Sequence, residues 1–370
     1  MSIDRRTLLG AAGALAAVTG SGTSVAQQST PTKAAPSRAP VIDVHTHMYS
    51  PGWQKAVKDA KDPNFRLGEG ADEGSLIYRG SSIGRIVPAM IDFDIRIKAM
   101  DEAKVDVALI SLTAPNVFWG TPAQSAQAAR MINDDFAAAQ KKYDKRIRWM
   151  ASLPWQNADD AIAELKRAKK NGAIGVCMLT NIVGSVLTAP EYRPIWKEIE
   201  AMDLPVFIHP TSPLTDNMNL TSDGEFGLFN SIGFMTETSV CFERMVFSGF
   251  LDVFPKLKLI ACHGGGYIPY LFGRFDIMWT RGERLNIKKV IKDVPSSYRS
   301  RIWYDSVVYQ QSTLEYLVKE VGADRVLYGS DYPFVIGDMK GILARVDALP
   351  PAERDAVRSG SALKIFDLDL

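Results

Sequence analysis

Eight apolar, strand-forming runs recur along this sequence, and a stretch of helical pattern follows each of them. The runs cover residues 41–47, 105–112, 147–154, 173–179, 204–210, 257–264, 302–308 and 326–334. Several of the helical stretches end at glycine, which is a common end for a helix. Alternation of strand and helix predicts a parallel sheet, and eight repeats favour an α/β fold of the (β/α)8 TIM barrel type.

An open, doubly wound sheet is the competing architecture for such alternation. That fold carries a glycine-rich phosphate-binding turn after its first strand. Here the first run continues as HTHMYSPGW, which is not a turn of that kind. Residues 50–91 form a long, polar, glycine-containing insertion after the first strand, and in a barrel we expect it over the active-site face.

The composition favours a protein that acts on small molecules. The chain has 370 residues, of which 46% are hydrophobic, enough for one large core. It has 43 basic and 42 acidic residues, and no basic block is interleaved with aromatic residues, so nucleic-acid binding is not expected. The three cysteines, Cys177, Cys241 and Cys262, have no framework spacing, and we predict that they are buried apolar residues.

The N-terminus resembles a twin-arginine signal peptide. Arg5 and Arg6 precede a weakly apolar run, and Ser24 and Ala26 form a small-residue cleavage site. The run is too short to span a bilayer, so we expect no membrane span in the mature chain. We predict a signal peptide over residues 1–26, a linker over 27–40, a barrel over 41–370 and a periplasmic or otherwise exported protein. A short N-terminal helix is the alternative.

The four histidines of the chain all lie at the ends of predicted strands, where barrel enzymes build their active sites. They are His45, His47, His209 and His263. Residues two apart on a strand face the same way, so His45 and His47 should point into the barrel mouth. Val44 and Thr46 should then face the helix layer. Two imidazoles on one face can bind one metal ion.

A carboxylate to complete a metal site comes from YGSDYPF at the end of the eighth run, where Asp331 lies next to the first strand of a closed barrel. His45, His47, His209 and Asp331 form a mononuclear set that leaves one position free for water. Such ligands suit Zn²⁺ first, with Mn²⁺ or Fe²⁺ as alternatives. A turn residue or a helix N-cap is the alternative role for Asp331.

Four motifs in this order, DVHTH, FIHP, FPKLKLIACHGGGYIPYLFGR and YGSDYPF, resemble the amidohydrolase superfamily. Within it, the chain is most similar to the aminocarboxymuconate-semialdehyde decarboxylase group. The resemblance implies one divalent metal on His45, His47, His209 and Asp331, with His263 as acid and base. Binuclear relatives carry a bridging lysine after the fourth strand, where this chain has Met178, so a single metal is expected.

The resemblance also implies the reaction, a decarboxylation of a small unsaturated or aromatic carboxylic acid. We predict that it uses a metal-activated water and that His263 and Asp331 are the catalytic residues. A metal-dependent hydrolase or hydratase of a lactone, an amide or an activated C=C bond is the alternative, because one barrel supports many reactions. A periplasmic metal-binding protein without turnover is a third interpretation.

Substrate binding is assigned to three further residues. Arg274 matches an arginine that the resembling family supplies from the neighbouring subunit to the substrate carboxylate, which implies a homodimer. A local ion pair with Asp276 or Glu283 is the alternative role for this arginine. Arg85 on the insertion is a second candidate cation, and Phe234 is a candidate wall of the pocket.

Overall fold

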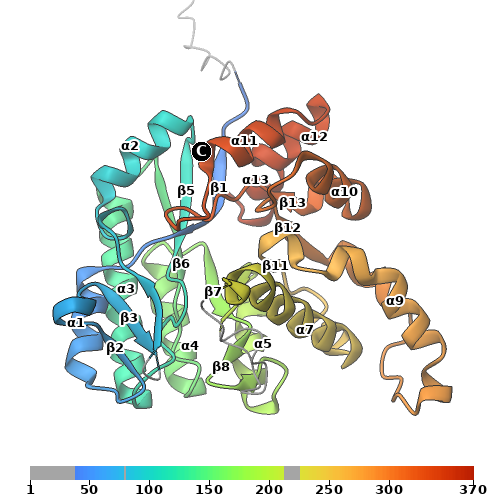
Figure 1. Ribbon diagram of the computed structural model, residues 1–370. Helices are drawn as coiled ribbons and strands as arrows, with labels where there is room; N and C mark the ends of the chain where they lie inside the picture. The colour runs from blue at the N-terminus through green and yellow to red at the C-terminus, as the bar shows by residue number, and fades with distance from the viewer. Residues whose placement is uncertain (1–37, 79–80, 212–225) are drawn as a thin grey trace, which may run out of the picture. The chain divides into compact units, whose positions relative to one another are not determined.

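The eight predicted strands form one sheet in the computed structural model (Figure 1), and neighbours in chain order pair in parallel. Each strand lies inside the run that predicts it. The strands are β1 (Ile42–His47), β5 (Val107–Ser111), β6 (Ile147–Ala151), β7 (Gly175–Leu179), β10 (Val206–His209), β11 (Leu259–Ala261), β12 (Ile302–Asp305) and β13 (Val326–Leu327).

The structure describes residues 38–78, 81–211 and 226–370. The predicted signal peptide, 1–26, and the linker as far as residue 37 lie outside the described residues. Among the helices within the described ranges, none is long and apolar enough to cross a membrane.

The sheet closes into a barrel where the first and last strands meet. The amide of Val44 donates to the carbonyl oxygen of Tyr328 at 2.9 Å, and that of His47 donates to Tyr332 at 2.8 Å. Thr46 and Tyr332 form a parallel bridge between these two segments. The predicted (β/α)8 TIM barrel is therefore confirmed.

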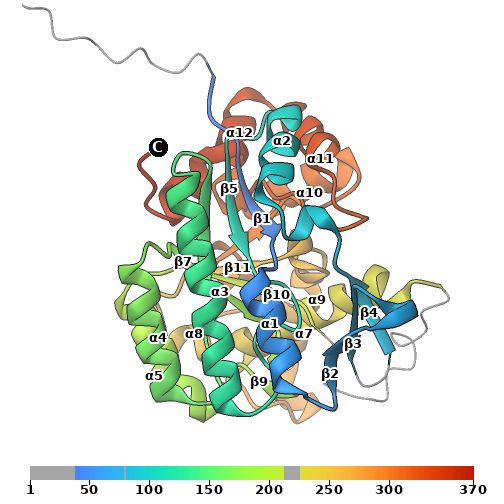
Figure 2. The ribbon, with the colours of Figure 1, turned by 90° about the vertical axis from the view of Figure 1, so that its left-hand side faces the viewer.

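Helices follow the strands, as the sequence pattern predicts. Those after β5, β6 and β7 run side by side in Figure 2. The first of them starts at a capping box. The Thr121 side chain accepts from the Gln124 amide, and the Gln124 side chain accepts from the Thr121 amide. The helices are α1 (Pro51–Ala60), α2 (Phe93–Ala103), α3 (Pro122–Lys142), α4 (Ala158–Lys170), α5 (Arg193–Ala201), α7 (Phe234–Phe247), α8 (Phe250–Val253), α9 (Ile268–Thr280), α10 (Gln311–Val321), α11 (Met339–Asp347), α12 (Pro351–Asp355) and α13 (Ser361–Ile365).

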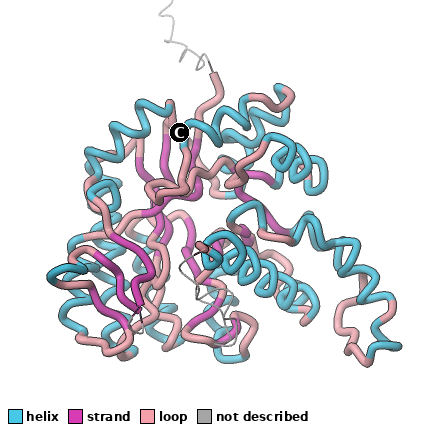
Figure 3. The backbone as a smooth tube through the Cα atoms, viewed as in Figure 1, coloured by secondary structure: helices cyan, strands magenta, loops and turns pink. Residues whose placement is uncertain are grey.

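The insertion after the first strand has structure of its own. It begins with α1 and continues into an antiparallel sheet that Figure 3 shows apart from the barrel strands. This sheet consists of β2 (Phe65–Leu67), β3 (Ser75–Tyr78) and β4 (Ser81–Arg85), and a separate hairpin, β8 (Asn181–Ile182) and β9 (Ser185–Val186), follows β7. The indole N–H groups of Trp53 and Trp119 both donate to the Asn116 carbonyl oxygen, which ties α1 to the loop after β5.

The barrel interior is filled by apolar side chains from the strands and from the C-terminal helix. Ile42, Val107 and Phe207 are among the strand residues of this cluster, and Ile365 and Phe366 of the C-terminal segment join it. A Cβ atom on Gly175, at the start of β7, would lie 3.1 Å from the Phe366 ring. The C-terminal segment thus covers the end of the barrel opposite the strand ends that carry the histidines.

Simple alternation along the first strand is wrong at one position. Asp43 lies opposite Ala108 and Thr46 opposite Ile110, so a bulge places two residues, Val44 and His45, against one residue of β5. Val44 consequently lies in the interior cluster instead of facing the helix layer. The bulge changes the direction of the strand's alternation, and the two histidines face inward because of it.

Candidate metal and catalytic site

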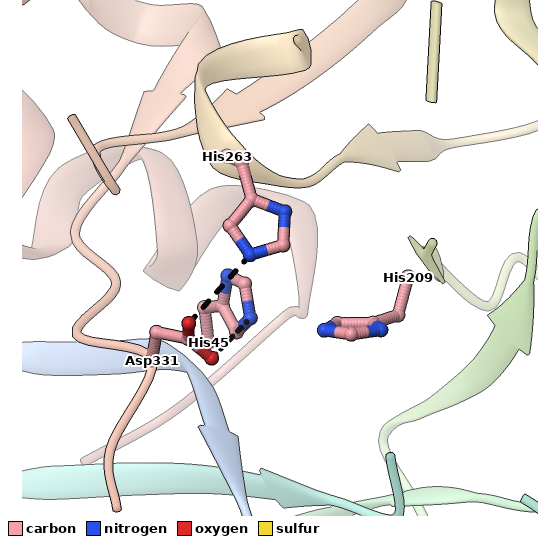
Figure 4. Close-up of side chains that lie close together, drawn as sticks. All are labelled: His45, His209, His263 and Asp331. Atoms are coloured by element: carbon pink, nitrogen blue, oxygen red, sulfur yellow. Dashed lines mark ion pairs between the residues drawn. The ribbon is translucent and has the colours of Figure 1, made fainter. Parts of the chain in front are cut away.

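The four histidines and Asp331 come together at the C-terminal ends of the strands, and all are at least 93% buried. Figure 4 shows His45, His209, His263 and Asp331 converging from separate segments. The Oδ1 atom of Asp331 lies 3.2 Å from His45 Nε2 and 3.6 Å from His47 Nε2. Its Oδ2 atom lies 3.7 Å from His263 Nε2. The sequence-predicted cluster is thus assembled.

The backbone at His263 leaves the strand pattern. Cys262 lies in the interior cluster, so a regular strand would direct the next side chain away from the barrel mouth. Instead, His263 has a φ of +54° and Gly264 a φ of +62°, which makes a left-handed turn. This turn returns the imidazole to the site. A left-handed residue with a side chain is uncommon, so it needs support from its surroundings.

The glycine run after His263 is required by close packing. A Cβ atom on Gly265 would lie 2.6 Å from the Tyr304 ring, and one on Gly266 would lie 2.5 Å from the Met235 carbonyl oxygen. Both glycines also have positive φ. The chain can therefore pass between β12 and α7 toward α9 only because these positions carry no side chain.

Asp331 is tied directly to the first strand. Its amide donates to the His45 carbonyl oxygen at 2.8 Å. The helix that follows, α11, is capped by the side chain of Asp338, which accepts from the Gly341 amide at 2.7 Å. The N-cap alternative for Asp331 is therefore wrong, and its carboxylate is directed at the histidines.

The donor atoms fit a metal ion. His45 Nε2, His47 Nε2 and Asp331 Oδ1 are buried and have no hydrogen-bond partner within the described part of the chain. The Nδ1 atom of each predicted ligand histidine contacts an oxygen: Asp305 Oδ2 at 2.5 Å for His45, Ser111 Oγ at 3.1 Å for His47 and the Pro210 carbonyl at 2.8 Å for His209. Such outer contacts fix each imidazole with Nε2 free to bind metal.

A second donor set shares three of these residues. One donor atom each from His45, His209, His263 and Asp331 lies within 4.8 Å of all the others, so His263 could replace His47 as a ligand. Unlike the other three histidines, however, His263 has a buried Nδ1 atom without a hydrogen-bond partner among the described residues. We therefore favour His47 as the ligand and His263 as the acid and base.

Burial and charge set the protonation of the predicted ligand residues. Burial lowers the pKa of His47 to about 4 and that of His209 well below its ordinary value, so both are neutral at pH 7, as metal binding requires. Burial also disfavours the charged form of His45, but Asp305 and Asp331 outweigh it and raise the pKa of His45 to about 10. Burial would raise the pKa of Asp331, but His45 holds it well below the ordinary value.

Aromatic rings border the histidine cluster. The ring centroid of Phe234, a predicted wall residue, lies 5.8 Å from that of His209 and 6.2 Å from that of His263. Phe334, three residues after Asp331, lies 5.6 Å from His47. The sequence analysis did not single out Phe334, although it belongs to the quoted YGSDYPF motif.

The two predicted cations are not part of this cluster. Arg274 is exposed on α9, and Arg85 is exposed at the end of β4. The local partners expected for Arg274 are engaged elsewhere in the described structure: Asp276 accepts from Ser296 at 2.7 and 2.8 Å, and Glu283 lies 4.0 Å from Lys289.

Two further residues of the site were missed by sequence reasoning. Asp305 ends β12 fully buried, and the signal available for it was a charged residue inside the apolar run IWYDSVV. Arg96 on α2 is also fully buried; it donates to Thr46 Oγ1 at 2.5 Å and to the His47 carbonyl oxygen. Burial lowers the pKa of Arg96 to about 10. No signal distinguished Arg96 from an exposed helix residue.

Comparison with known proteins identifies the family. The amidohydrolase family model matches residues 42–368. The chain belongs to the amidohydrolase family. It is 28% identical over 346 residues to a 2-amino-3-carboxymuconate-6-semialdehyde decarboxylase of Dictyostelium discoideum, covering 89% of this chain and 92% of that one. It is 28% identical over 339 residues to a gamma-resorcylate decarboxylase of Rhodococcus jostii, covering 84% and 99%.

A solved structure extends the comparison. A dihydroxybenzoic acid decarboxylase from a Polaromonas species, with bound manganese and the inhibitor 2-nitroresorcinol, superimposes with a TM-score of 0.72 at 25% identity. The match covers 90% of this chain and 98% of that one. These relatives are decarboxylases, and the predicted class, a metal-dependent decarboxylase on the amidohydrolase barrel, is confirmed.

The two donor sets make opposite predictions for metal content. Replacing His47 with alanine should remove most of the metal, because it deletes a ligand, whereas His263→Ala should keep about one ion per chain. Elemental analysis of purified proteins tests this, with His45→Ala and Asp331→Ala as shared ligand controls. Metal loss in His263→Ala together with retention in His47→Ala would instead assign the set that contains His263.

Proposed function

We propose that this protein decarboxylates a small aromatic or unsaturated carboxylic acid with one divalent metal held by His45, His47, His209 and Asp331. One observation carries the proposal. The unpartnered Nε2 atoms of His45 and His47 converge on Asp331 Oδ1, and His263 Nε2 lies 3.7 Å from the other oxygen of that carboxylate. The substrates and inhibitors in the names of the relatives, which are small unsaturated or aromatic compounds, support the substrate class.

The metal is proposed as Zn²⁺, with Mn²⁺ as the alternative to compare. Three imidazoles and one carboxylate suit both ions. The bound manganese of the Polaromonas enzyme supports the alternative. In either form, the ion would polarise a substrate oxygen and lower the pKa of a bound water.

Proton transfer is assigned to His263, with Asp331 as its partner. Loss of carbon dioxide leaves an electron pair on carbon, and a proton must take its place. Asp331 Oδ1 faces the ligand histidines and Oδ2 faces His263, so the carboxylate can serve the metal and hold the His263 N–H at the same time. His263 then supplies the proton to the carbon, and solvent restores it.

The aromatic border suits a flat substrate. Phe234 packs against Phe229 at 4.7 Å between ring centroids, which fixes it beside His209. Phe334 lies on the His47 side of the cluster. Rings on two sides can stack on or edge against an aromatic acid and keep bulk water away from the reacting carbon.

Carbon dioxide release should identify the reaction. We expect the metal-loaded protein to release carbon dioxide from an acid in a panel of ortho-hydroxybenzoates and muconate-type acids. His263→Gln should lower kcat by about 10²–10⁴-fold while metal content stays unchanged, because it removes proton transfer only. Product analysis by mass spectrometry checks the assignment. Turnover of lactones or amides without carbon dioxide would favour the hydrolase alternative.

We further propose that the protein forms a homodimer in which Arg274 binds the substrate carboxylate in the partner's site. An arginine fork matches a carboxylate in two hydrogen bonds. Tyr270, Arg274 and Ile277 share one face of α9, and Tyr270 and Ile277 are 80% and 41% exposed. Exposed apolar side chains around a cation support a role for this face in assembly.

Subunit complementation tests this assembly. Arg274→Ala and His263→Ala should each be nearly inactive alone. A mixture reassembled from both should regain roughly a quarter of wild-type activity, because half of the dimers are mixed and each of these holds one intact site. Arg274→Ala alone, dissociated and reassembled in the same way, is the control. Absence of recovery after verified subunit exchange would contradict a shared site.

Export is proposed from the N-terminal sequence. Arg5, Arg6 and the Ser24–Ala26 site support cleavage after residue 26 and a periplasmic or otherwise exported protein. We expect the native protein to begin at Gln27, and an Arg5→Lys, Arg6→Lys variant to accumulate uncleaved. N-terminal sequencing of fractionated cells measures both. A native protein that keeps residues 1–26 in the cytoplasm would refute export.

A further inference from the structure

Asp305 connects the metal ligands to the acid. This carboxylate, fully buried at the end of β12, accepts four hydrogen bonds. Oδ2 accepts from His45 Nδ1 at 2.5 Å and from the His263 amide at 2.9 Å. Oδ1 accepts from the Gly264 amide at 2.9 Å and the Val307 amide at 3.0 Å.

We propose that Asp305 is a positioning residue that orients the His45 imidazole for the metal and fixes the backbone turn that presents His263. The inference rests on the proposed function for the roles of His45 as ligand and His263 as acid. It adds a single group on which both roles depend. In both roles Asp305 acts through another residue and not by contact with the substrate.

The contact with His45 fixes its tautomer. An ionised carboxylate can only accept hydrogen bonds, so the neutral imidazole must carry its proton on Nδ1. Nε2 then presents a lone pair, and this is the atom that lies 3.2 Å from Asp331 Oδ1. A carboxylate behind a ligand histidine also makes the imidazole a stronger donor to metal.

The contacts with the backbone support the left-handed turn. His263 and Gly264 both have positive φ, and their two consecutive amides point at the two oxygens of one carboxylate. The direction of the His263 side chain depends on this turn, because the preceding residue, Cys262, already occupies the interior position. Without Asp305, two buried amides would lose their acceptor and the turn would lose its support.

Asparagine is the informative substitution because it has nearly the same shape. Its oxygen can keep the bonds from Gly264 and Val307 in the place of Oδ1. Its NH2 group then faces His45 Nδ1 and the His263 amide. Both of these groups donate to Oδ2 in the native protein, and an NH2 group cannot accept from them. His45 would have to accept at Nδ1 and carry its proton on Nε2, which blocks the metal-binding atom.

Asp43 offers a matched control in the same strand as His45. It too is a fully buried carboxylate, but it accepts from the Ser330 hydroxyl at 2.6 Å and from the amides of Ser330 and His45 at 3.1 and 3.3 Å. No imidazole nitrogen is among its described partners. Asparagine at this position can keep an acceptor for the backbone without changing a histidine tautomer.

The experiment titrates metal-free protein with Zn²⁺ against a competing chelator and then measures kcat and KM. Asp305→Asn should lower the zinc affinity by about 10–100-fold. At saturating zinc its kcat should still fall more than 10-fold with KM within a few-fold of wild type, because His263 is displaced. Asp43→Asn should bind zinc within a few-fold of wild type.

Two further outcomes keep the test decisive. If Asp305→Asn does not fold, Asp305→Ala is measured with and without formate, and formate should restore zinc affinity by replacing the carboxylate. Wild-type affinity and kcat in Asp305→Asn, or no effect of formate on a weakened Asp305→Ala, would overturn the inference. Failure of the proposed function is a separate result, in which the wild-type protein itself binds no zinc or His47→Ala binds it equally well.

Discussion

Closure of the barrel between β1 and the segment after β13 is the contact on which the site depends. The two sides of this seam carry His45 and His47 on one strand and Asp331 on the other. The Asp331 amide donates to the His45 carbonyl, and the His47 amide donates to Tyr332. The ladder that closes the sheet thus also brings the Nε2 atoms of His45 and His47 within 3.6 Å of Asp331 Oδ1. A barrel that failed to close would not bring these donor atoms together.

A buried cation supports the outside of this seam. Arg96 donates to the Thr46 hydroxyl, and that hydroxyl donates to the Tyr332 carbonyl oxygen at 3.0 Å. The guanidinium also lies 4.9 Å from the centroid of the Tyr332 ring. Burying an arginine is costly unless its donors are satisfied. Here the donors bind the Thr46 hydroxyl and the His47 carbonyl oxygen, both just after the bulge, while Nε has no hydrogen-bond partner in the described part of the chain. The guanidinium thus holds the end of β1 and, through Thr46, the Tyr332 segment.

The sequence predicts those parts of the structure that follow from its repeating strand–helix pattern. Eight repeats predict the barrel, and parallel strands end at one rim, so the four histidines and Asp331 could be placed together without coordinates. Val44 was placed wrongly because a bulge adds one residue without a sequence signal. Asp305 and Arg96 were missed because their roles depend on contacts across 260 and 50 residues, which no local spacing encodes. Arg274 lies on an exposed face of α9, outside this cluster.

The charges of the assembled site account for its fit to a decarboxylation. Burial would raise the pKa of Asp305, but His45 outweighs it and lowers the pKa, so Asp305 and Asp331 are both ionised. These two carboxylates raise the pKa of His45 to about 10, and a divalent ion bound at His45 Nε2 would replace that proton as their counter-charge. A bound substrate carboxylate would add one negative charge. Decarboxylation would remove that charge, because the carboxylate leaves as neutral carbon dioxide and a proton takes its place on the carbon. The reaction would thus discharge a buried carboxylate, which is favourable in a low-dielectric interior.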